Sequence, residues 1–104
     1  MNLTDLTEES ASEFIHRRRL QIVIHSCIYY RFDQNLISDH QWAEWAKELV
    51  KAQEMFPKIA EKQLWANEFA DFDGSTGYHL PINESGVVQR ALKLLEISKK
   101  VRVK

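Results

Sequence analysis

Cysteine is nearly absent: the chain has a single one, Cys27, among 104 residues. One cysteine permits neither an internal disulfide nor a four-cysteine zinc site within the chain. A catalytic thiol needs a neighbouring base, and His25, two positions away, would point elsewhere on a helix. The apolar residues around Cys27 indicate instead a small buried thiol.

Glycine and proline are also scarce, with three and two residues respectively. This scarcity argues against a turn-rich all-β fold and favours long helices. Hydrophobic residues make up 44% of the chain, which is enough to form one core in a single helical domain of residues 1–104. We therefore predict an all-α fold of three to four helices.

An excess of charge of one sign is lacking as well. The formal net charge is −1, so we do not expect nucleic acid as a partner, and we interpret the basic run Arg17–Arg19 as a solvated face.

No apolar run approaches the ~20 residues that span a bilayer, so no membrane partner is expected. The first residues lack the pattern of a signal peptide, which predicts a cytoplasmic location.

Apolar residues spaced by three and four predict two long helices that form an N-terminal hairpin. With Ser12 as its N-cap, the first helix would run to about Phe32 and lie centrally in the fold. The second would begin at the capping signature Ser38-x-x-Gln41. Pro57 would end it or begin the next helix, because proline cannot continue the hydrogen-bond ladder.

The remaining residues predict a third helix over 59–69, an irregular glycine-containing loop over 71–82 and a C-terminal helix over 85–98. The loop opens with Asp71 and Asp73, as a calcium loop does, but the glycine and glutamate that such a loop needs fall on Thr76 and Ile82. We interpret it as an Asp-Gly turn capped by a hydroxyl, and we predict no metal site.

The three tryptophans, Trp42, Trp45 and Trp65, allow two interpretations. Their helical spacing favours the role of core anchors. The alternative is an exposed binding surface, because large aromatic residues dominate interaction hot spots.

Residues 25–57, "HSCIYYRFDQNLISDHQWAEWAKELVKAQEMFP", resemble the N-terminal helical subdomain of NAD-dependent bacterial DNA ligases. The order and spacing agree without a gap through the corner between the two helices. The matching positions are His25, Tyr29, Tyr30, Asp33, Ile37, Ser38, Asp39, Leu49, Phe56 and Pro57.

The resemblance implies a ligand site for NAD or for nicotinamide mononucleotide (NMN), its nicotinamide half, at the corner of the hairpin. Tyr29 and Tyr30 would offer flat surfaces to the cationic ring, and Asp39 would offset its charge or hold a ribose hydroxyl. His25 lies one turn before Tyr29 on the same face. Trp42 stands where the family has a tyrosine and could also stack.

Two departures from the family limit what the resemblance implies. Ala43 replaces the second carboxylate of the family's site. The lysine motif Lys-x-Asp-Gly that accepts the nucleotide in ligases falls on Asp71-Phe72-Asp73-Gly74, and aspartate cannot form the phosphoramide bond. We therefore predict no catalytic residues and a protein that is not an enzyme.

Beyond Pro57 the chain is similar instead to small phage or prophage accessory proteins, a resemblance that implies no activity. An alternative function follows from the altered pair Trp42-Ala43 and the extra C-terminal region. On this second hypothesis, the protein binds a host or phage protein and modulates a host or defence enzyme, with the hairpin used only as a scaffold.

Overall fold

The computed structural model describes residues 6–102, and the side chains of residues 6–99. Within this range every regular element is a helix: α1 (Glu8–Phe32), α2 (Asp39–Met55), α3 (Pro57–Lys62) and α4 (Ser85–Arg102). The prediction of an all-α fold with three to four helices is confirmed. The C-terminal helix is longer than the predicted range of 85–98.

Helix α1 begins one turn earlier than predicted. Thr7 is its N-cap: Thr7 Oγ1 accepts from the Ser10 amide at 3.2 Å, and Ser10 Oγ accepts from the Thr7 amide at 2.8 Å. The two orphan amides of the helix start are thus satisfied reciprocally. The expected cap, Ser12, is wrong, and its hydroxyl accepts a hydrogen bond from the Gln63 side chain instead.

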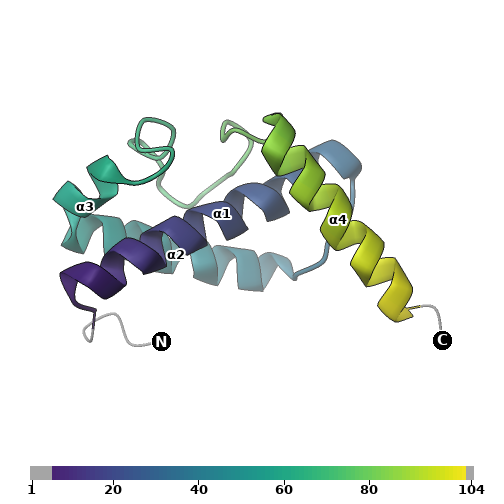
Figure 1. Cartoon of the computed structure of the whole chain (residues 1–104), viewed down its shortest axis with the longest axis horizontal. Helices are drawn as coiled ribbons and strands as arrows, with labels where there is room; N and C mark the ends of the chain where they lie inside the picture. Colours follow the sequence, from purple (N-terminus) through teal and green to yellow (C-terminus); the bar gives the residue numbers. More distant parts are fainter. Residues whose placement is uncertain (1–5, 103–104) are drawn as a thin grey trace.

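Helix α1 is the central element, as its two apolar rows predict. It contacts each of the other three helices, with α2 running beside it and α4 crossing near its C-terminal end (Figure 1). Its 25 residues span about 37 Å, most of the 43 Å long axis of the molecule. Its apolar side chains at less than 2% exposure include Phe14, Ile15, Ile22, Val23, Cys27 and Ile28.

The hairpin corner follows the predicted signals closely. Asp33 ends α1 in a left-handed conformation with φ 51°, and Ser38 Oγ accepts from the Gln41 amide at 3.0 Å to begin α2. Helix α2 ends at Met55 with Phe56 as its C-cap, and Pro57 is the first residue of α3. A proline suits that position because its missing N–H would be unpaired there in any case.

The third helix is shorter than predicted. It ends at Lys62, and residues 64–71 form turns rather than helix. Trp65 has φ 62°, a left-handed conformation that a continuing α-helix does not contain. Its indole N–H donates to Glu84 Oε2 at 3.1 Å, so the residue is held by the start of the last helix rather than by its own segment.

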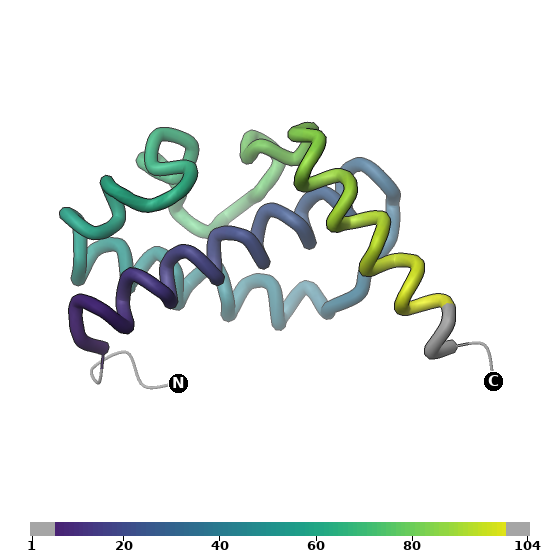
Figure 2. Tube along the Cα trace, in the orientation of Figure 1, coloured from purple at the N-terminus to yellow at the C-terminus, as the bar shows by residue number. Residues whose placement is uncertain are grey.

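Residues 63–84 cross over the hairpin and return to the start of α4 (Figure 2). This segment supplies a second layer of core side chains: Trp65, Phe69, Phe72, Leu80 and Ile82 are all buried. Of the tryptophans, only Trp65 is fully buried, whereas Trp42 and Trp45 are partly exposed. The core-anchor interpretation therefore holds in full for one of the three.

The interpretation of Arg17–Arg19 as a solvated face is wrong for Arg19, which is 1% exposed. Its Nε donates to Gln53 Oε1 at 2.8 Å, and a terminal nitrogen donates to the Leu64 carbonyl at 2.9 Å. The guanidinium also lies 5.2 Å from the Phe69 ring centre. Burial lowers the pKa of Arg19 to about 10, so the side chain stays charged at neutral pH.

Cys27 is buried, as its apolar neighbours predict, and burial raises the pKa of its thiol. A thiol that is both buried and protonated at neutral pH is a poor nucleophile.

None of the helices in the described range combines the length and the apolar character needed to cross a bilayer.

Candidate functional site

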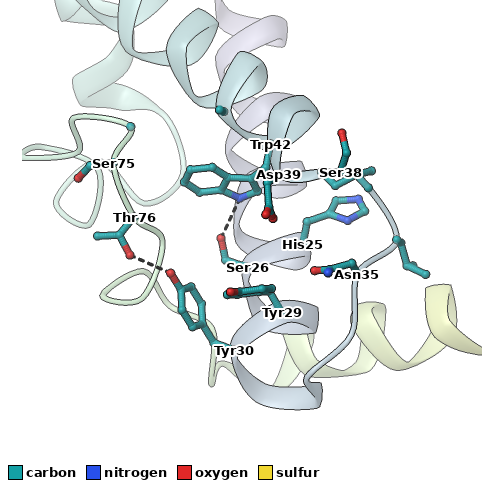
Figure 3. Close-up of a pocket in the computed structure, with 14 residues that line it drawn as sticks. His25, Ser26, Tyr29, Tyr30, Asn35, Ser38, Asp39, Trp42, Ser75 and Thr76 are labelled. Carbon is teal, nitrogen blue, oxygen red and sulfur yellow. Dashed lines mark hydrogen bonds between the residues drawn. The ribbon is translucent and has the colours of Figure 1, made fainter.

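A cleft of about 300 Å³ lies at the corner where α1 gives way to α2 (Figure 3). Three parts of the chain form it: the last two turns of α1, the linker with the first turns of α2, and the loop that crosses above them. Its lining residues are His25, Ser26, Tyr29, Tyr30, Asn35, Leu36, Ile37, Ser38, Asp39, Trp42, Ala43, Gly74, Ser75 and Thr76.

All five residues predicted from the sequence line this one cleft: His25, Tyr29, Tyr30, Asp39 and Trp42. Helical spacing explains the convergence, because residues three and four apart share a helix face. His25 and Tyr29 share a face of α1 in this way, and Asp39 and Trp42 share a face of α2. Figure 3 shows Tyr29 and Asp39 directed into the same space from the two arms of the hairpin.

Trp42 forms a fixed wall of the cleft. Its indole N–H donates to Ser26 Oγ at 3.2 Å, which joins α2 to α1. Its ring meets Phe72 edge to face at 6.4 Å between centres. Gly77 lies directly behind this pair: a Cβ at Gly77 would fall 2.9 Å from Ser26 Cβ and 3.2 Å from Trp42 Cζ2. Only glycine allows the loop to approach so closely.

The two tyrosines differ in what they do. Tyr29 is 49% exposed and packs edge to face on Tyr30 at 4.8 Å. Tyr30 is 40% exposed, and its hydroxyl hydrogen-bonds the Thr76 hydroxyl at 2.9 Å, which ties the loop to α1. Tyr29 therefore offers the open aromatic surface, and Tyr30 has an anchoring role that the sequence did not predict.

His25 lies at the inner end of the cleft with its ring edge to face against Trp45, 5.6 Å between centres. Its Nδ1 is buried and finds no hydrogen-bond partner among the described residues. Burial lowers the pKa of His25 below its ordinary 6.5, so the imidazole is neutral at pH 7. Asp39 is then the one charged side chain among the lining residues.

This unpaired histidine predicts a pH dependence of stability. Because the folded pKa lies below 6.5, the unfolded chain binds more protons than the folded one as the pH falls through that value, and the free energy of unfolding decreases. His25→Phe should remove that part of the acid sensitivity. At pH 7.5 it should leave stability unchanged or raise it by up to about 1 kcal/mol, because no buried polar atom is left unpaired.

Urea unfolding of the wild-type protein and the variant at pH 7.5 and 5.5 measures both effects. His40→Phe is the matched control, since His40 is exposed on the first turn of α2. A wild-type protein and a His25→Phe variant that lose equal stability between the two pH values would contradict this expectation.

Sequence patterns missed the third wall of the cleft, which is formed by Gly74, Ser75 and Thr76. The turn itself matches the expected hydroxyl-capped Asp-Gly turn. Asp73 Oδ1 accepts from the Ser75 amide at 2.9 Å and from the Ser75 hydroxyl at 2.6 Å, and these bonds lower the pKa of Asp73. What the sequence could not indicate was that this turn lies over the hairpin corner.

The cleft therefore combines aromatic surfaces, one carboxylate and several neutral hydroxyl groups. Such a lining suits a flat cation that also carries hydroxyl groups. In the described part of the chain, no group of three or more His, Cys, Asp or Glu residues is placed to hold a metal ion.

Comparisons of the chain with models of known protein families, with curated proteins and with solved structures give no match.

Proposed function

We propose that the cleft binds a nicotinamide nucleotide, NMN or the NMN half of NAD, and that the protein is a small non-catalytic module of the phage or prophage type. The observation that carries the proposal is the convergence of Tyr29, Asp39 and Trp42 on one cleft from the two arms of the hairpin. The resemblance of residues 25–57 to the ligase subdomain supplies the identity of the ligand.

The dimensions and chemistry of the cleft support this ligand. Small-molecule sites typically enclose about 300–1,000 Å³, and the cleft, at about 300 Å³, suits one half of a dinucleotide better than the whole. A pyridinium ring placed on Tyr29 would gain a cation–π contact of about 0.5–2 kcal/mol. The Asp39 carboxylate would offset the ring's charge or hold a ribose hydroxyl.

The proposed role is binding without bond chemistry. The position of the nucleotide-accepting lysine of ligases falls on Asp71, which is exposed and outside the lining of the cleft. Because nicotinamide nucleotides are metabolites of the cell interior, the proposal includes a cytoplasmic location.

Asp39→Ala should weaken NMN binding by about thirtyfold. The loss of a charged partner costs on the order of 2 kcal/mol, and each 1.4 kcal/mol is a factor of ten. Calorimetric titration of the purified protein with NMN and with NAD measures the affinity. Glu44→Ala is the matched control, because Glu44 is an exposed acid on the same helix that does not line the cleft. Wild-type protein that gives no heat at millimolar ligand would end the proposal.

A second candidate function is the binding of a host or phage protein partner, and the exposure of three neighbouring tyrosines favours it. Tyr78 is 69% exposed and packs edge to face on Tyr30, which in turn contacts Tyr29. Exposed aromatic clusters are typical of interaction hot spots. Asp39→Ala separates the two candidates: here it would only weaken the start of α2, by about 1 kcal/mol or less, and leave the tyrosines in place.

A further inference from the structure

A second depression adjoins the cleft along α2. The two share Ala43 and Gly74 at their common boundary, and the second depression is lined by Lys47 and Lys51. We name it the lysine groove. It has a volume of about 310 Å³, comparable to that of the cleft.

Both residues that line the cleft and the groove in common are small. Ala43 has only a methyl group, and Gly74 has no side chain at all. Gly74 also adopts φ 86°, a conformation that disfavours any other residue. The family that residues 25–57 resemble has an aspartate at the position of Ala43. The small residue at this position is therefore a feature of the present chain.

The charges on the two sides of the boundary differ. The cleft contains the Asp39 carboxylate, whereas the groove contains two ammonium groups one helical turn apart. The ion pair between Arg18 and Glu48, at 2.8 Å, involves neither lysine, and among the described residues neither Lys47 nor Lys51 lies within ion-pair distance of a carboxylate. Glu54 and Asp73 also line the groove, so it contains two carboxylates as well, and the hydrogen bonds from Ser75 favour the charged form of Asp73. Of the two depressions, only the groove contains ammonium groups.

We propose that the cleft and the lysine groove form one two-part site for a zwitterionic mononucleotide, with the pyridinium ring in the cleft and the phosphate on Lys47 and Lys51. This inference rests on the proposed function. Trp42 and Lys47 are five residues apart, about 7.5 Å along the helix axis, and Ala43, which lines both depressions, lies between them in the sequence. Lys47 follows Ala43 by four residues, so the two lie on the same face of α2.

The test compares NMN with nicotinamide riboside, which has the same ring and sugar but no phosphate. Wild-type protein should bind NMN at least about tenfold more tightly than the riboside, and added salt should reduce that preference. The double substitution Lys47→Ala and Lys51→Ala should remove the preference and leave riboside affinity unchanged. Lys58→Ala is the control, since Lys58 is exposed on α3 outside both depressions.

The outcomes distinguish the inference from the function on which it rests. Equal wild-type affinity for NMN and the riboside would overturn the two-part site and leave nicotinamide binding in place. A double variant that keeps the full NMN preference would do the same. If neither compound binds the wild-type protein, the proposed function fails and the two-part site fails with it.

Discussion

Arg19→Met should lower the free energy of unfolding by about 2–4 kcal/mol. The substitution keeps an unbranched apolar stem but removes the two guanidinium nitrogens that donate hydrogen bonds. The Leu64 carbonyl and the Gln53 side chain would lose partners that now lie 2.9 and 2.8 Å away, and each unpaired buried group costs about 1–3 kcal/mol. The substitution also removes a buried charge and therefore the cost of desolvating it. This gain offsets part of the loss, so the net decrease in the free energy of unfolding is smaller than the summed cost of the two unpaired groups.

The reason for so large an effect is the position of Arg19 between three parts of the chain. It extends from α1 to Gln53 on α2 and to the turn after α3, where its guanidinium also faces Phe69. Trp65, the next residue after Leu64, has a left-handed conformation and lies three residues beyond the end of α3. Arg19 therefore holds the point at which the chain leaves the hairpin and begins to cross it.

Urea unfolding followed by circular dichroism measures the change. Arg17→Met is the matched control, because Arg17 is exposed two positions away on the same helix, and surface substitutions usually stay within about 0.5 kcal/mol. An Arg19→Met variant as stable as wild type would mean that the buried charge is no net benefit to the fold.

Gly77→Ala should destabilise the protein by about 1–3 kcal/mol, as is usual when a group is forced into a packed site. The nearest atom to the added Cβ is Ser26 Oγ, which accepts the hydrogen bond from Trp42. The methyl group must therefore move either the loop or the Ser26 hydroxyl, and both movements disturb the wall of the cleft. We expect a change in tryptophan fluorescence together with the loss of stability.

Two comparisons isolate the steric cause. Gly86→Ala is the matched control: no atom lies within 4 Å of a Cβ there, and Gly86 is in α4. Helix propensity alone should make that variant about 0.5–1 kcal/mol more stable. Combining Gly77→Ala with Ser26→Ala should recover part of the lost stability by freeing space. A single Gly77→Ala variant as stable as wild type would show that the loop does not press on α1.

Local signals predicted the hairpin well. The Ser38 cap, the break between two helices at Pro57 and the burial of Cys27 each depend on neighbours within a few positions. The two arms of the predicted site came from the resemblance of residues 25–57 to the ligase subdomain, and Tyr29 and Asp39 are separated only by the corner of the hairpin. The all-α class was predicted from composition, because glycine and proline are scarce.

What the sequence did not predict depends on contacts between distant residues. Arg19 looked like part of a solvated basic run, yet its partners are 34 and 45 positions away. The third helix ends at Lys62, where Gln63 has an extended backbone, and Trp65 beyond it is held by Glu84 before the start of the last helix. Thr76 reaches Tyr30 across 46 positions. No periodicity encodes such pairings, so the loop wall of the cleft was missed.

The central place of α1 has a consequence for how the molecule melts. Helix α1 contacts the other three helices and α4 packs chiefly on it, so α2 and α3 are the main pair of helices still in contact once α1 is lost. Unfolding is therefore expected to be cooperative, in a single all-or-none transition. The candidate cleft belongs to that same unit, so a ligand bound there would protect backbone amides along the full length of the chain's longest helix.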